Sequence, residues 1–266
     1  MKPKRFKYIY LLLCVALCIT TISRGYYLKH HTNEGNPFSR AINTIIPEAI
    51  PGINHVIDDS LSDLEETKKM ERTIERFMAQ WEIKGASLAI MKNGKLLYSK
   101  GFGIADSAEG TPVNVSNIFR IASLSKLITA TGIMKLWEEK KLSLDQPVFG
   151  EKGILNDSAF LDIKDPRIRE ITVEHLLRHQ GGYSIRAGDP LFCTPSVAQS
   201  MQTPLPLSAD DMVRFAASTR LRFRPGEGNA YSNLGYVVLG KVIEKVSGMP
   251  YETFIRDSIL IPIGCF

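Results

Sequence analysis

Two short segments of the chain contain residue types that can carry out nucleophilic catalysis. The first is Ser123-Leu124-Ser125-Lys126, which follows a strand-like run, Phe119-Arg120-Ile121, and lies near the start of a predicted helix over 122–140. Residues three apart on a helix share a face, so Ser123 and Lys126 are predicted to lie one turn apart. A serine hydroxyl becomes an effective nucleophile when a base takes its proton, and a lysine kept neutral by burial or nearby positive charge can be that base. Exposed N–H groups at the helix start would help to stabilise an oxyanion.

The second segment is Tyr231-Ser232-Asn233, which precedes a long apolar helical pattern. A tyrosine hydroxyl can relay a proton to a leaving group, and an asparagine amide can hydrogen-bond a substrate amide. Together the two segments offer Ser123, Lys126 and Tyr231 as candidate catalytic residues and Asn233 as a candidate substrate-binding residue.

Each of these signals also has a purely structural interpretation. A Ser-x-x-Lys pattern is expected about once by chance in a chain of this composition, and then represents a helix cap and a solvated lysine. Asn233 is equally suited to be the N-cap of the helix that follows it. His175 and His179 stand four residues apart and could face one metal ion, but the sequence offers no third ligand in a known pattern, which favours a structural role.

The surrounding pattern predicts mostly helices and one hairpin. Apolar residues at helical spacing over 61–81 indicate an amphipathic helix. The β-like runs 86–91 and 95–102 are joined through Asn93-Gly94, a dipeptide suited to a tight hairpin turn. Further helices are predicted to begin at the N-caps Thr172 and Ser208, and over 234–247. Because two strands alone make a marginal sheet, this fold requires strands beyond that hairpin.

Composition and charge exclude several classes of protein. The chain has 266 residues, of which 44% are hydrophobic and 23% charged, as in a folded globular protein rather than a disordered or collagen-like one. Its formal net charge of +5 comes from the first thirty residues, which hold six basic and no acidic side chains. The remaining 27 basic and 28 acidic residues nearly balance, so the body lacks the basic footprint of a nucleic-acid-binding protein.

The N-terminus has the layout of an export signal. Four basic residues precede an apolar run over 8–22, which is short for a bilayer span and lacks an Ala-x-Ala cleavage site. We therefore expect either a signal peptide or an uncleaved membrane anchor over 1–30, a linker over 31–55 and a folded domain over 56–266. The domain would face the periplasm or the cell exterior, or be secreted if the leader is cleaved. Cys193 and Cys265 form no disulfide framework and are expected to be either one bridge or two free thiols.

Taken together, the motifs resemble the serine β-lactamase and penicillin-binding-protein superfamily, especially its class C β-lactamase, D-alanyl-D-alanine carboxypeptidase and esterase-like branch. The resemblance extends from about residue 64 to 263. The segments that carry it, in the order this family shows, are Ile83-Lys84-Gly85-Ala86-Ser87-Leu88-Ala89, Gly101-Phe102-Gly103, Phe119-Arg120-Ile121-Ala122-Ser123-Leu124-Ser125-Lys126, His175-Leu176-Leu177-Arg178-His179-Gln180-Gly181-Gly182, Phe223-Arg224-Pro225-Gly226, Tyr231-Ser232-Asn233-Leu234-Gly235-Tyr236 and Pro262-Ile263-Gly264.

The resemblance implies an α+β, β-lactamase/transpeptidase-like fold with a helical subdomain and an N-terminal hairpin of an antiparallel sheet. It also implies Ser123 as the acylated nucleophile, Lys126 as its base, Tyr231 in proton transfer, Asn233 in substrate binding, and no metal or organic cofactor. The substrate would be a small molecule or a peptidoglycan-type compound with an amide, β-lactam or ester bond.

A third family motif, Lys or His followed by Thr or Ser and Gly, does not occur in this sequence. The expected fold is therefore a C-terminally truncated one in which later sheet strands are missing. Three hypotheses remain. The first is a serine hydrolase that forms an acyl-enzyme, and the second is a non-catalytic cell-surface binding protein or inactive remnant of the same family. The third is a chain that does not fold stably, because it lacks strands needed to cover its hairpin.

Overall fold

The structure, a computed structural model, describes residues 65–92, 95–183 and 188–265, which divide into two compact units, Met1–Ala122 and Ser123–Phe266. The predicted leader over 1–30 and the predicted linker over 31–55 lie outside the described residues. Within the described ranges, no helix combines the length and the apolar composition needed to cross a membrane.

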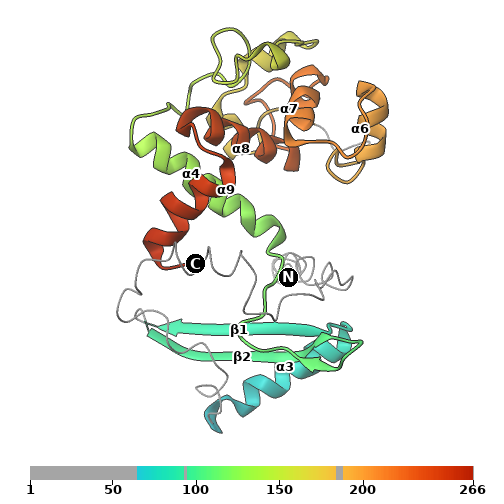
Figure 1. The fold of residues 1–266 in the computed structure, drawn as a ribbon, viewed down its shortest axis with the longest axis vertical. Helices are drawn as coiled ribbons and strands as arrows, with labels where there is room; N and C mark the ends of the chain where they lie inside the picture. Colours follow the sequence, from blue (N-terminus) through green and yellow to red (C-terminus); the bar gives the residue numbers. More distant parts are fainter. Residues whose placement is uncertain (1–64, 93–94, 184–187, 266) are drawn as a thin grey trace, which may run out of the picture. The chain divides into compact units, whose positions relative to one another are not determined.

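The first unit is a helix packed on a small antiparallel sheet (Figure 1). A 3₁₀ turn, η2 (Glu65–Thr67), leads into α3 (Lys68–Gln80). The strands β1 (Gly85–Lys92), β2 (Lys95–Asp106) and β3 (Thr111–Pro112) follow in that order in the sheet. β1 and β2 pair in the register Gly85 to Gly103, which confirms the predicted hairpin, although its Asn93-Gly94 turn lies outside the described residues.

Side chains from α3 and the sheet form a small core, built on Met78, Tyr98 and Phe102. The buried Glu71 of α3 accepts hydrogen bonds from Tyr98 Oη at 3.0 Å and Lys100 Nζ at 3.1 Å. Burial alone would raise the pKa of Glu71, but the hydrogen bonds from Lys100 and Tyr98 hold it below its ordinary value. These contacts fix α3 on the sheet.

The Gly101-Phe102-Gly103 segment shows why small residues flank the buried phenylalanine. A Cβ at Gly101 would lie 2.2 Å from the Val113 carbonyl oxygen, and one at Gly103 would lie 2.2 Å from the Lys84 carbonyl oxygen. Gly103 also has a φ of +73°, a conformation that L side chains rarely adopt. Glycine at both positions therefore lets neighbouring backbone approach β2.

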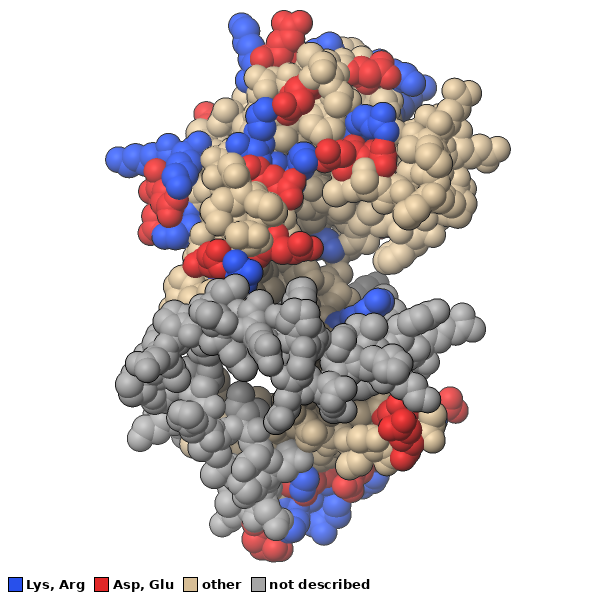
Figure 2. All heavy atoms as spheres, viewed as in Figure 1, with Lys and Arg blue, Asp and Glu red and all other residues tan. Residues whose placement is uncertain are grey.

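The second unit is helical, and its core is built around its longest helix, α8. Its α-helices are α4 (Ser125–Glu138), α5 (Val173–Leu177), α6 (Thr194–Met201), α7 (Ala209–Ser218), α8 (Asn233–Ser247) and α9 (Tyr251–Ile255). Its shorter helical turns are η3 (Ala122–Leu124, at the junction of the two units), η4 (Ser158–Phe160), η5 (Pro166–Glu170), the π-helical turn η6 (Arg256–Leu260) and η7 (Ile261–Ile263). The α8 side chains Val238, Leu239, Val242 and Ile243 are fully buried, and α8 packs against α4, α5, α7 and α9 (Figure 1). Basic and acidic side chains are interspersed over the face of these helices seen in Figure 2.

Local capping chemistry explains where several of these helices begin and end. Thr172 and Ser208 accept hydrogen bonds from the backbone N–H groups of His175 and Asp211, so both predicted N-caps are confirmed. Gly248 ends α8 in the left-handed conformation, as expected of a C-cap glycine. The interpretation of Asn233 as N-cap is wrong, because Ser232 Oγ accepts from the Gly235 N–H at 3.0 Å and Asn233 is already helical.

The predicted strand-like run Phe119-Arg120-Ile121 is also corrected, because it pairs with no strand among the described residues. The predicted helix over 122–140 begins as a 3₁₀ turn and becomes α-helical at Ser125. The helix predicted from Thr172 ends at Leu177, before the Gly181-Gly182 pair, and the sequence pattern did not indicate α6, α9 or β3.

The thiols of Cys193 and Cys265 are both free, which agrees with one of the two alternatives for them.

The buried carboxylate of Asp165 joins two loops of the second unit. We predict that its contribution to the free energy of unfolding is lost in acid. Asp165 accepts from Arg167 Nη2 at 2.7 Å and from the Leu221 backbone N–H at 3.0 Å. The hydrogen bonds from Arg167 hold the pKa of Asp165 well below its ordinary value. A depressed pKa in the folded state stabilises the fold above the ordinary carboxyl pKa of about 3.9. That stabilisation is lost as the pH falls through the folded-state pKa.

We therefore expect Asp165→Asn to lower the free energy of unfolding by about 2–3 kcal/mol at pH 7, since a charge-assisted acceptor is removed. The deficit should shrink as the pH is lowered from 4 towards 2. Urea unfolding followed by circular dichroism over this pH range measures both effects. Asp162→Asn is the matched control because its side chain is 80% exposed and makes only a 4.0 Å ion pair with Lys164. A deficit that stays constant with pH would contradict the assignment.

Candidate active site

Ser123 and Lys126 lie three residues apart in the helical segment that opens α4. Ser123 belongs to the exposed 3₁₀ turn η3, and Lys126 is the second residue of α4. The three-residue spacing places Lys126 Nζ 3.4 Å from Ser123 Oγ. The Ser-x-x-Lys spacing therefore produces the serine–amine contact that the sequence predicted.

Tyr231 approaches the same hydroxyl from the loop before α8. Its Oη donates a hydrogen bond to Ser123 Oγ at 2.7 Å. Its ring also lies beside the amine, with Lys126 Nζ 4.9 Å from the ring centroid. Ser123 Oγ is thus flanked by a phenol hydroxyl and an amine.

Asn233 opens α8 and contacts Lys126 rather than capping its own helix. Its Oδ1 accepts from Lys126 Nζ at 2.5 Å, and its Nδ2 donates to Asp189 Oδ2 at 2.7 Å. Because Ser232 supplies the cap, the Asn233 side chain remains available for these tertiary contacts. The structure therefore brings together all four residues that the sequence predicted for the site.

His179 supports the loop that carries Tyr231. Its Nδ1 accepts from the Ser232 N–H at 3.2 Å, and its carbonyl oxygen accepts from the Ala230 N–H at 2.9 Å. Its ring stacks at 4.6 Å from the ring of Tyr231. Burial, and secondly the charge of Lys126, hold the pKa of His179 below its ordinary value, which favours the neutral, hydrogen-bond-accepting form.

Both histidines accept a hydrogen bond from the backbone through a ring nitrogen. His175 Nδ1 accepts from the Thr172 N–H at 3.3 Å within the capping box of α5. His179 Nδ1 accepts from the Ser232 N–H in the same way. In the part of the chain that the structure describes, no group of three or more His, Cys, Asp or Glu side chains could hold a metal ion.

Packing within the second unit sets the distance between the segments that carry Lys126 and Asn233. A Cβ at Gly132 of α4 would lie 3.0 Å from Ile243 Cδ1 of α8, so glycine allows these two helices a close approach. Thr129 Oγ1 and Tyr251 Oη are 2.7 Å apart, which ties α4 to α9 as well. Core packing therefore holds the start of α4 close to the start of α8. Lys126 and Asn233, which lie in these first turns, are held near one another as a result.

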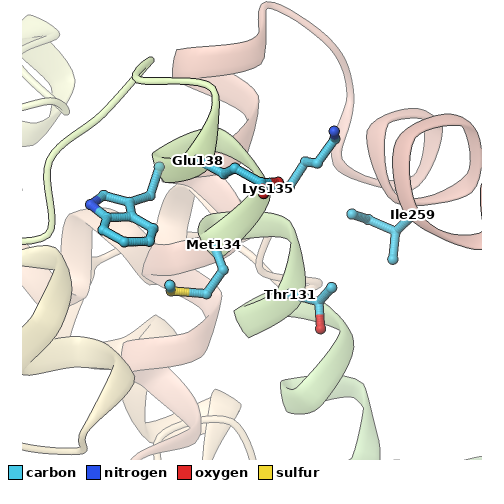
Figure 3. Close-up of a pocket in the computed structure, with 6 residues that line it drawn as sticks. Thr131, Met134, Lys135, Glu138 and Ile259 are labelled. Atoms are coloured by element: carbon cyan, nitrogen blue, oxygen red, sulfur yellow. The ribbon is translucent and has the colours of Figure 1, made fainter.

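A surface hollow of about 280 Å³ also lies along α4, but it is separate from this cluster. Figure 3 shows its lining side chains Thr131, Met134, Lys135 and Glu138 of α4, with Ile259 opposite. None of the residues around Ser123 lines it. The candidate site is therefore defined by the hydrogen-bonded cluster and not by this hollow.

Two further residues of the cluster were not found from the sequence. Asp189 contacts Asn233 across 44 residues of chain, and Tyr236 places its ring centroid 5.7 Å from Lys126 Nζ while its Oη donates to the Leu177 carbonyl oxygen at 3.1 Å. Burial, and secondly the neighbouring Tyr231, raise the pKa of Tyr236. Tyr236 lies within the quoted motif, but nothing local marks Asp189.

Comparison with known proteins identifies the family. The family model described as Beta-lactamase matches residues 70–265, and the chain belongs to that family. The chain is 33% identical over 201 residues to penicillin-binding protein 4* of Bacillus subtilis, a match covering 74% of this chain and 40% of that protein. It is 26% identical over 204 residues to esterase EstB of Burkholderia gladioli, covering 74% of this chain and 49% of that protein.

Solved structures agree with this assignment. The octameric penicillin-binding protein homologue from Pyrococcus abyssi is 36% identical and superimposes with a TM-score of 0.61, covering 75% of this chain and 43% of that one. The predicted superfamily and its β-lactamase/transpeptidase-like fold are thus confirmed. The chain spans less than half the length of each of these three relatives.

Proposed function

We propose that this chain supplies the acylation machinery of a serine hydrolase that acts on an amide, β-lactam or ester. The observation that carries the proposal is the position of Ser123 Oγ, which accepts from Tyr231 Oη at 2.7 Å and lies 3.4 Å from Lys126 Nζ. Membership of a family whose relatives are named penicillin-binding protein and esterase supports the reaction class.

The proposed reaction begins with transfer of the Ser123 hydroxyl proton to unprotonated Lys126 as Oγ attacks the substrate carbonyl carbon. An unprotonated amine has two N–H groups and one lone pair, so Lys126 can donate to Asn233 Oδ1 and still accept this proton. The carbonyl π electrons move to oxygen, where N–H groups at the start of the α4 helical segment favour the negative charge.

The tetrahedral intermediate then collapses to an ester of Ser123. The bond to the leaving amine or alcohol breaks, and Tyr231 passes that group a proton that is replenished from Lys126. Water subsequently attacks the ester carbon and gives up one proton to Lys126 or Tyr231. The bond between that carbon and Ser123 Oγ then breaks, the acid product leaves, and the proton taken from water passes to Ser123 Oγ. Lys126 occupies one lone pair of Asn233 Oδ1, and Asp189 occupies one N–H of Asn233 Nδ2. The second lone pair and the second N–H of this amide would then hydrogen-bond the substrate amide.

We further propose that the substrate is a small molecule or a peptidoglycan fragment met outside the cytoplasm. The basic and apolar N-terminal sequence supports export, with the first thirty residues serving as a signal peptide or membrane anchor.

The test is covalent labelling of the full chain with a fluorophosphonate, which reacts by displacement of fluoride from phosphorus by an activated serine. We expect the intact mass to rise by one probe adduct and peptide mapping to place that adduct on Ser123. Heat-denatured protein, the control, should stay unlabelled. A folded protein that binds a peptidoglycan fragment reversibly but forms no adduct would overturn the hydrolase and support the non-catalytic alternative. Turnover of a chromogenic cephalosporin, a D-alanyl-D-alanine peptide and a nitrophenyl ester would then separate the substrate classes.

A further inference from the structure

The carboxylate of Asp189 is fixed by its own loop before it reaches the site. Its Oδ1 accepts from the Leu191 N–H at 2.9 Å, and its carbonyl oxygen accepts from the N–H groups of Phe192 and Cys193 at 2.9 and 3.0 Å. These three bonds form the turn that leads into α6. The remaining carboxylate oxygen, Oδ2, is therefore presented to Asn233 Nδ2 in a defined position.

An asparagine amide at this position has two orientations that differ in which end faces Lys126. With Oδ1 towards Lys126 Nζ and Nδ2 towards Asp189, both hydrogen bonds pair a donor with an acceptor. Rotating the amide by 180° would place Nδ2 against the amine and Oδ1 against the carboxylate. An ionised carboxylate is an acceptor only, so the rotated form would lose the hydrogen bond to Asp189, and its Nδ2 could meet Lys126 only at the lone pair that the proposed proton transfer needs.

We propose that Asp189 is a positioning residue of the active site, an inference that rests on the proposed function. It holds the Asn233 amide with Oδ1 towards Lys126, and this contact orients the lysine amine towards Ser123 Oγ. The hydrogen bonds run in one direction, from Lys126 to Asn233 to Asp189, and Asp189 closes the series. It acts through Asn233, since its carboxylate contacts neither Lys126 nor Ser123 among the hydrogen bonds of the described residues.

The first readout is the rate of fluorophosphonate labelling in a double-mutant cycle. Asp189→Asn presents an N–H group where the carboxylate accepted, and the rate should fall about tenfold or more, because a charge-assisted hydrogen bond contributes roughly 1.5–3 kcal/mol. In an Asn233→Ala background there is no amide to orient, so adding Asp189→Asn should change the rate less than twofold. Asp189→Glu, which keeps an acceptor-only group, should recover part of the loss. Asp162→Asn, in an exposed ion pair, is the matched control and should label as wild type does.

The second readout is independent of activity. The side-chain amide signals of Asn233 in a ¹⁵N-correlation spectrum are assigned by their loss in Asn233→Ala, and Asp189→Asn should shift them while Asp162→Asn does not. If the wild type fails to label but these signals shift, the hydrolase proposal falls while the contact by which Asp189 orients the Asn233 amide stands. The positioning role is overturned if the signals do not move, or if Asp189→Asn slows labelling equally with and without Asn233.

Discussion

Replacing Ser123 with alanine is expected to remove fluorophosphonate labelling completely while leaving the fold intact. Ser123 is exposed, and within the described residues its side chain hydrogen-bonds with Tyr231 and Lys126, so its loss leaves no buried polar group there unpaired. The nucleophilic oxygen is then absent, and no acyl or phosphonyl ester can form at this position. Intact-mass spectrometry after a fixed labelling time measures the loss directly.

The matched control for this experiment is Ser125→Ala. Ser125 lies two residues further along the same exposed segment, and its carbonyl oxygen rather than its side chain accepts from Thr129. We expect the Ser125 variant to label at the wild-type rate and both variants to give the same far-UV circular dichroism. Equal labelling of the Ser123 variant and the wild type would place the nucleophile elsewhere and refute the site.

Features decided by short-range chemistry were predictable from the sequence. The caps Thr172 and Ser208 satisfy helix N–H groups within three residues, and the β1–β2 hairpin follows from two β-like runs on either side of Asn93-Gly94. Ser123 and Lys126 share one turn, so their contact also follows from spacing. Pairing these residues with Tyr231 and Asn233, more than 100 residues away, required the family resemblance, because no local rule links them.

Features decided by tertiary contacts were not predictable in this way. Ser232 and Asn233 are adjacent and both suit an N-cap, and the choice between them is explained by the contacts of Asn233 with Lys126 and Asp189. Phe119–Ile121 has β-like residues, but a strand also needs a partner, and the run has none within the described ranges. Asp189 is defined by a partner 44 residues away, which no local periodicity reveals.

Replacing Lys126 with alanine is expected to slow acylation by about two to four orders of magnitude, the range attributed to a positioned general base. Ser123 Oγ would keep its hydrogen bond with Tyr231 but lose the amine that accepts its proton. Asn233 Oδ1 would also lose its donor, while Nδ2 could still donate to Asp189. The nucleophile would thus remain in place without its base, so the rate should fall far more than the affinity for the probe. The dependence of the labelling rate on probe concentration separates these two quantities.

Lys135→Ala is the matched control, because Lys135 lies on the same helix and pairs with Glu139 in an i,i+4 contact on the surface. Such a surface pair contributes at most about 0.5 kcal/mol, so this variant should label like the wild type. Lys126→Arg provides a further comparison: arginine preserves a positive charge but remains protonated in proteins and cannot accept the serine proton. If Lys126 acts as the base, the arginine variant should be as slow as the alanine variant. If it acts only as a positive charge near the serine, arginine should restore most of the rate, and the proposed proton transfer from Ser123 to Lys126 would be refuted.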